Sequence, residues 1–161
     1  MEEYGYAIIT PYGFIKNVHN KIIQYLMKES FSSDLRTLIS VYDINDEELA
    51  RLVNISKKNY NLEVKKQGSA SSVTVLLVKG TDATNKLKKF VKDVEDKLQD
   101  ESNLLKVYVS NNSEQAIEDL CEYFDLEDFD KIEQYLFDNS NQSITSFNFK
   151  ALSKLKNNFN R

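Results

Sequence analysis

The side chains that most often perform chemistry are scarce in this chain of 161 residues. It contains one histidine, His19, and one cysteine, Cys121, so it offers no histidine or cysteine pair to hold a metal ion. His19 falls within a helical pattern, where we expect an ordinary surface or helix-packing role. Cys121 falls on the apolar face of another predicted helix, where a thiol behaves as a small hydrophobic group.

Carboxylates gather over residues 125–133, but their spacing does not predict a metal site. A calcium loop needs a glycine at its turn and ligands at alternate positions, and this segment has neither. A solvated acidic helix accounts for the pattern. The chain also lacks a phosphate-binding loop, a glycine-rich dinucleotide loop and a nucleophile elbow.

Hydrophobic periodicity predicts four strands that are each followed by a helix. The strands cover residues 6–10, 35–42, 73–78 and 104–109. The helices cover residues 16–28, 45–55, 81–98 and 114–124. Beyond them we predict a helix over 128–137, a loop over 139–146 and a short basic helix over 151–159. This order fits a ferredoxin-like antiparallel sheet or a parallel doubly wound sheet, and the pattern alone leaves both open.

The composition is that of a soluble globular domain, with 41% hydrophobic and 29% charged residues. The net charge is −4 and the two signs are interspersed, which argues against a nucleic-acid partner. No segment approaches the ~18–20 apolar residues of a membrane span. With a single cysteine and no signal-peptide pattern, we expect a cytoplasmic protein.

Three segments together resemble the nucleoside diphosphate kinase family. Thr10-Pro11-Tyr12-Gly13 follows the first strand, where the family has Lys-Pro-Asp-Gly. Residues 71–80 (SSVTVLLVKG) are similar to the family's central strand. Residues 107–124 (VYVSNNSEQAIEDLCEYF) are similar to the strand and helix that hold its catalytic histidine.

The resemblance implies an α/β (α+β) fold, built on a ferredoxin-like four-stranded antiparallel sheet with covering helices. It covers residues 1–124 as a nucleoside diphosphate kinase-like domain. Residues 125–161 form a C-terminal extension, which we expect to be helical and packed on the same domain. The aromatic residues of this extension make it a candidate surface for a protein partner.

The catalytic positions that the resemblance implies are altered. Tyr108 stands in place of the phosphate-accepting histidine, Thr10 in place of a lysine, and Leu105 in place of an asparagine. A phenol with an ordinary pKa of ~10 is a poor nucleophile at neutral pH, and its phosphate ester transfers onward slowly. Between Phe90 and Tyr108 there is no arginine, where the family has a loop with phosphate-binding arginines. The sequence therefore predicts a degenerate site at Tyr108 and Thr10.

Three residues remain candidates for ligand binding. Tyr60 aligns with the family's base-stacking phenylalanine, Lys88 with a phosphate-contacting arginine, and Ser110 with a serine near the histidine. The alternative is that Tyr60 is a half-buried loop aromatic and Lys88 is one charge on a solvated helix face. A nucleotide is the only cofactor that the resemblance leaves open, and no metal is predicted.

These observations favour a catalytically inactive domain that acts as a protein-interaction or nucleotide-sensing regulatory module. The resemblance also implies a homodimer, formed through the second strand and the first helix. The alternative is a divergent phosphotransferase or nucleotide hydrolase that uses Tyr108 or Ser110, although the sequence reveals no base to activate either hydroxyl. A third hypothesis is a nucleic-acid-binding module, for which only Lys106 and Tyr108 fit the required pattern on the strands.

Overall fold

The computed structural model describes residues 2–32, 35–43, 72–99, 105–124, 129, 130, 133 and 144–146. Several predictions concern residues outside these ranges. Among them are the helices over 45–55 and 151–159 and the candidate ligand residue Tyr60.

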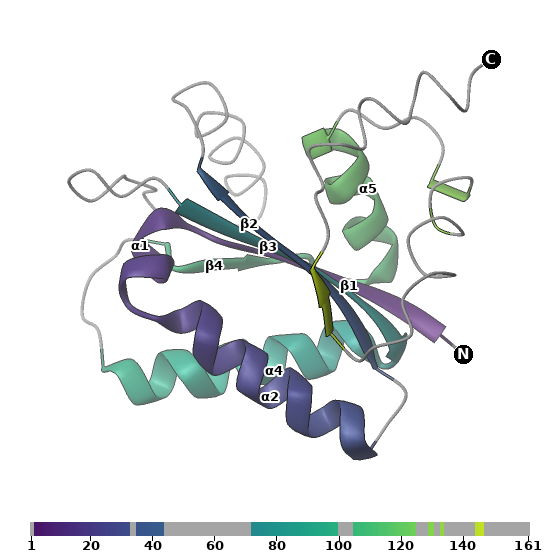
Figure 1. Ribbon diagram of the computed structural model, residues 1–161. Coiled ribbons are helices and arrows are strands. Elements are labelled where there is room, and N and C mark those ends of the chain that lie inside the picture. Colours follow the sequence, from purple (N-terminus) through teal and green to yellow (C-terminus); the bar gives the residue numbers. More distant parts are fainter. Residues whose placement is uncertain are drawn as a thin grey trace.

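Five strands form one sheet in the order β4-β1-β3-β2-β5 (Figure 1). They are β1 (Glu2–Ile9), β2 (Arg36–Asp43), β3 (Ser72–Thr81), β4 (Val107–Val109) and β5 (Ile144–Ser146). The strands β4, β1, β3 and β2 each run antiparallel to their neighbours in this series. The predicted four-stranded antiparallel sheet of a mixed α+β fold is therefore confirmed, and the arrangement is consistent with a ferredoxin-like one.

Helices α2 (Val18–Ser32) and α4 (Ala83–Leu98) cover one face of this sheet (Figure 1). Helix α4 buries Leu87, Phe90, Val91 and Val94, whose spacing of three and four residues places them on one side. They pack against alternate residues of the strands, such as Ala7 and Ile9, because side chains of a strand alternate between its faces. Within the described part of the chain, no helix is long and apolar enough to cross a bilayer.

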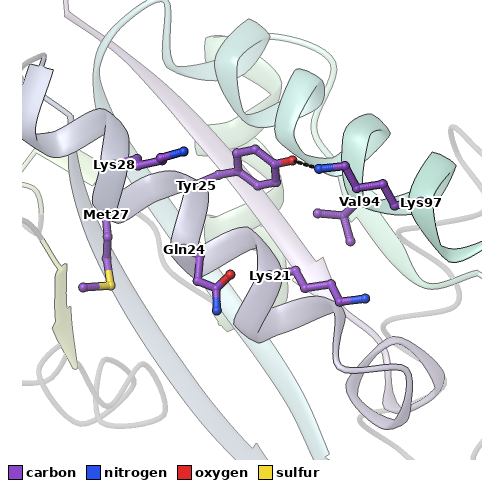
Figure 2. A pocket seen from close by; sticks show the side chains of 7 residues that line it. All are labelled: Lys21, Gln24, Tyr25, Met27, Lys28, Val94 and Lys97. Atoms are coloured by element: carbon purple, nitrogen blue, oxygen red, sulfur yellow. Dashed lines mark hydrogen bonds between the residues drawn. The ribbon is translucent and has the colours of Figure 1, made fainter.

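An aromatic contact joins the two helices of this layer. The ring of Tyr25 in α2 stacks on that of Phe90 in α4, with centroids 5.4 Å apart and planes 9° apart. The Tyr25 hydroxyl accepts a 2.8 Å hydrogen bond from Nζ of Lys97 (Figure 2). Tyr25 thus fixes the spacing of α2 and α4 on their outer side.

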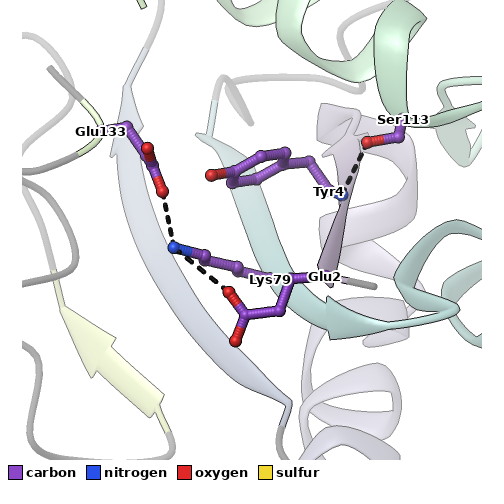
Figure 3. Close-up of polar contacts among 5 residues, drawn as sticks. All are labelled: Glu2, Tyr4, Lys79, Ser113 and Glu133. Carbon is purple, nitrogen blue, oxygen red and sulfur yellow. Dashed lines mark hydrogen bonds and ion pairs between the residues drawn. The ribbon is translucent and has the colours of Figure 1, made fainter. Parts of the chain in front are cut away.

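Helix α5 (Ser113–Phe124) lies over the opposite face of the sheet (Figure 1). That face is formed by the other set of alternate residues, including Tyr6, Ile8 and Tyr108, all of them fully buried. The start of α5 is tied to β1, because the backbone amide of Tyr4 donates a 2.9 Å hydrogen bond to Oγ of Ser113 (Figure 3).

The turn after β1 forms a short helix, α1 (Pro11–Ile15), which Thr10 caps. Its proline stands at the start of the helix, where a missing N–H costs nothing. Gly13 is required by space, because a Cβ there would lie 2.3 Å from the carbonyl oxygen of Lys106. Local structure is therefore enough to explain why a proline and a glycine occur in this turn.

Strand β5 comes from the C-terminal extension and runs parallel to β2, pairing Ile144 with Thr37. The predicted loop over 139–146 is therefore wrong for its last three residues. Ile144 and Thr145 are β-branched and suit a strand, but the Asn/Ser-rich stretch before them suggested a loop. Because β5 pairs with residues 37–39 of β2, that stretch of edge backbone is not open to a second copy of the chain.

A second contact ties the extension to the sheet (Figure 3). Nζ of Lys79 on β3 lies 2.5 Å from Oε1 of Glu133 and 3.4 Å from Oε2 of Glu2. The ring of Phe129 packs edge-on against Tyr4, with centroids 5.1 Å apart. These residues join the extension to β1 and β3 on the face that α5 covers.

The ion pair shifts the acid–base behaviour of its neighbours. The hydrogen bond from Lys79, followed by one from Tyr4, holds the pKa of Glu133 below its ordinary value of 4.5. Burial, followed by the hydrogen bond to Glu133, raises the pKa of the Tyr4 hydroxyl. The folded state thus favours a charged Glu133 beside a neutral Tyr4.

Because the folded state lowers the pKa of Glu133, it binds fewer protons there than the unfolded chain does. The ion pair therefore stabilises the fold above pH 4.5, and this stabilisation is lost as the pH falls through the lowered pKa. We expect Glu133→Gln to reduce the free energy of unfolding by roughly 1 kcal/mol at neutral pH. Urea denaturation of the wild type and of Glu133→Gln across the acid range measures this difference in free energy of unfolding. The difference should shrink towards zero as the pH falls.

The matched control is Glu2→Gln. Glu2 meets the same Nζ at 3.4 Å, and its side chain is 51% exposed, so solvent screens the contact and its effect should be smaller. A difference between wild type and Glu133→Gln that stays constant down the acid range would contradict the assigned ion pair.

Candidate functional site

The candidate site is a buried group of polar side chains between β4 and α5. Tyr108 is fully buried, and its hydroxyl donates a short hydrogen bond to Oδ2 of Asp119. Ser110, also fully buried, donates to the same oxygen at 2.7 Å. Nε2 of Gln115 donates to the other oxygen, Oδ1, at 2.7 Å. Both oxygens of Asp119 therefore have partners, although the side chain has no exposed surface.

Local structure explains why these groups meet. Tyr108 and Ser110 are two positions apart on an extended segment, so both side chains point to the face that α5 covers. In α5, Ala116, Asp119 and Leu120 are buried at helical spacing and face the sheet. Gln115 lies one turn before Asp119 on the helix and reaches its carboxylate from the side.

A carboxylate that contacts two hydroxyls has the composition of a general base beside a nucleophile. Here its surroundings favour a structural role, since three donors compensate for removing the carboxylate from water. The phenol and the serine hydroxyl both lie in the interior and contribute to the packing between β4 and α5. A nucleotide phosphate cannot reach either hydroxyl while α5 stays in place.

Thr10 is fully buried at the end of β1. Its hydroxyl donates to the carbonyl oxygen of Leu105 at 2.5 Å and accepts a 3.1 Å hydrogen bond from the amide of Gly13. The resemblance predicts a cation at this position in an active kinase. The threonine instead caps α1 and joins it to the segment before β4, so it carries no charge and presents no exposed hydroxyl.

Lys88 lies on α4 and is half-buried. Its Nζ donates a 2.7 Å hydrogen bond to the carbonyl oxygen of Asn111, in the turn that follows Ser110. The side chain of Ser110 faces α5, whereas α4 covers the other face of the sheet. The structure therefore brings Lys88 to the turn beside Ser110, but among the described residues it forms no hydrogen bond with Tyr108 or Ser110.

The ring of His19 stacks on that of Phe14, with centroids 4.2 Å apart and planes 8° apart, so of the two expected roles the structure shows helix packing. Burial lowers the pKa of its imidazole and favours the neutral form. Cys121 is half-buried rather than in the core. No group of three potential metal ligands occurs among the described residues.

Sequence reasoning missed Asp119. The predicted apolar face of this helix used Ile117, Leu120 and Cys121, whereas the buried side is one position earlier, at Ala116, Asp119 and Leu120. The sequence does contain a signal for it: this carboxylate directly precedes Leu120 and follows Ala116 by one helical turn, so it lies on the side of the helix that those two residues occupy. Because the sequence pattern assigns Asp119 no role, it reveals no base beside the hydroxyls of Tyr108 and Ser110.

Comparisons with known proteins return no match to a protein-family model, to a curated protein or to a solved structure.

We expect Asp119→Ala to lower the free energy of unfolding by roughly 2–4 kcal/mol, because it leaves two buried hydroxyls without their acceptor. Asp119→Asn keeps one acceptor oxygen and should cost less. Urea denaturation monitored by circular dichroism measures both.

Glu118→Ala is the matched control, since Glu118 is the exposed neighbour on the same helix. It should change the stability by no more than ~0.5 kcal/mol. An Asp119→Ala protein as stable as Glu118→Ala would show that the buried carboxylate does not hold β4 and α5 together.

Proposed function

We propose that this chain is a catalytically inactive domain of the nucleoside diphosphate kinase type, which acts as a protein-interaction or nucleotide-sensing module. The observation that carries the proposal is the complete burial of Tyr108, with its hydroxyl bonded to Asp119. A phosphate carrier must meet the terminal phosphate of a nucleotide and then release it to a second one. The phenol of Tyr108 is buried beneath α5, so it can neither accept a phosphate from a nucleotide nor release one to a second nucleotide.

The surroundings of Tyr108 support the same conclusion. Phosphoryl transfer depends on cations that neutralise the charge developing on the transferred group. Thr10 uses its hydroxyl to cap α1, and Lys88 is bonded to the carbonyl oxygen of Asn111. The polar group of Tyr108, Ser110 and Asp119 is held together by hydrogen bonds between the β4 segment and α5. Its hydrogen bonds therefore serve the fold.

A divergent phosphotransferase or hydrolase remains the second candidate, because Asp119 contacts both Tyr108 and Ser110 and would supply the missing base. It requires α5 to move away from the sheet during each reaction cycle. The nucleic-acid hypothesis is less well supported, since Tyr108 is fully buried and Lys106 is 9% exposed. Neither side chain is presented on an open sheet surface for stacking or for phosphate contact.

Incubation with γ-labelled ATP tests the absence of catalysis. We expect the protein to acquire no acid-stable or base-stable label, because neither hydroxyl is accessible to the nucleotide. Mass spectrometry of the intact chain provides a second measurement of the same outcome. A label that disappears in Tyr108→Phe, or in Ser110→Ala, would overturn the proposal and favour the second candidate.

Thermal denaturation with ATP separates the two roles of the module. A rise in melting temperature assigns the domain to nucleotide sensing, and no rise assigns it to protein interaction. If the melting temperature rises, Lys88→Gln should weaken the apparent affinity about tenfold by removing a charged phosphate ligand. Lys89→Gln, at an exposed position next to it, should leave the affinity unchanged. An equal loss in both variants would exclude Lys88 as the ligand.

A further inference from the structure

A groove of about 640 Å³ runs between α2 and α4 on the outer side of the molecule (Figure 2). It lies on the helical layer, away from the face where α5 buries Tyr108. The described residues that line it are Lys21, Gln24, Tyr25, Met27, Lys28, Val94 and Lys97. Three of these seven side chains are lysines, and none of the described lining residues carries a carboxylate.

The positive charge of this groove is notable because the whole chain has a net charge of −4. On α4, Asp93 lies one turn before Lys97 and helps to raise its pKa, but it is not among the residues that line the groove. The hydrogen bond to Tyr25 is the main cause that raises the pKa of Lys97, so this lysine stays charged at neutral pH. The groove therefore offers three cations to a ligand.

The spacing of the cations suits an extended partner better than a compact ion. Lys21 and Lys28 are seven residues apart on α2, which places their backbones about 10.5 Å apart along the helix. Lys97 faces them from α4. Two apolar side chains also line the groove, the half-exposed Met27 and the buried Val94. A thioether at such a surface adapts to apolar side chains of different shapes.

We propose that the groove between α2 and α4 binds an acidic peptide segment of a partner protein, whose carboxylates meet the three lysines and whose apolar side chain packs on Met27. This inference rests on the protein-interaction part of the proposed function and names the chemistry of the partner. Complementary charge at such a surface speeds association and selects among partners.

Phosphate ligands and nucleic acid fit the groove less well. Phosphate recognition favours arginine forks or cradles of backbone amides, and the described lining residues include no arginine. RNA recognition needs aromatic faces that are open for stacking. The only aromatic side chain among the described lining residues is Tyr25, whose ring is stacked on Phe90 and whose hydroxyl is bonded to Lys97.

The test uses the full chain and a fluorescein-labelled synthetic peptide of glutamate, alanine and leucine, followed by fluorescence anisotropy. We expect the double variant Lys21→Glu/Lys28→Glu to weaken peptide binding about tenfold or more, since two attractions become repulsions. The control Lys89→Glu/Lys92→Glu makes the same change in net charge at exposed positions of α4 outside the groove. It should change the affinity by no more than about twofold. Melting curves verify that both variants are folded.

A charge-swapped peptide keeps the test decisive. A peptide with lysine in place of each glutamate should prefer the Lys21→Glu/Lys28→Glu protein to the wild type. The inference is overturned if the wild type does not bind the glutamate peptide, or if both double variants weaken binding equally. It is also overturned if ATP or single-stranded RNA displaces the peptide from the groove.

Failure of this inference is distinguishable from failure of the proposed function. Label transferred from ATP to Tyr108 or Ser110 would remove the proposed function without affecting the peptide result. Absence of peptide binding, in a protein that acquires no label, would remove only the acidic partner from this groove.

Discussion

The buried carboxylate of Asp119 is the constraint on which this end of the molecule depends. A charge without exposed surface is tolerable only where donors replace water, and Tyr108, Ser110 and Gln115 supply them. Two of the donors come from the β4 segment and one from α5. The same carboxylate therefore fixes the helix to the strand, and any change that separates them leaves polar groups buried without partners.

The same hydrogen bonds explain why Tyr108 cannot be exposed for catalysis without a loss of stability in β4. β4 comprises only three residues and pairs with β1 at one edge of the sheet. Backbone hydrogen bonds from Thr10 to Lys106 and from Ser110 to Tyr6 continue the pairing on either side. A strand this short needs a contact on its covered face, and the Tyr108–Asp119 hydrogen bond provides it. Exposing the phenol for catalysis would break the contact that holds the strand.

The predictable part of the fold is the part encoded by local periodicity. The apolar run over 73–78 predicted β3, and the spacing of Leu87, Phe90 and Val94 predicted α4 and its buried face. The site was less predictable, because periodicity does not show that Tyr108 and Ser110 bond to Asp119, 11 and 9 residues further along the chain. Asp119 sits within an amphipathic helix, where the sequence pattern assigns it no role. Likewise, nothing near Lys79 in the sequence indicates Glu133, its ion-pair partner 54 residues away.

The two faces of the sheet differ in what they leave available to a partner. On one face, α5 and the described residues of the extension cover Tyr108 and Lys79 and use their polar groups internally. On the other, the helices present their lysines outward around the groove. The net charge of −4 does not cancel this local field for a bound ligand, because charges beyond about 8 Å are largely screened at physiological salt. An acidic segment that reaches the groove therefore responds to Lys21, Lys28 and Lys97 more than to the overall charge of the chain.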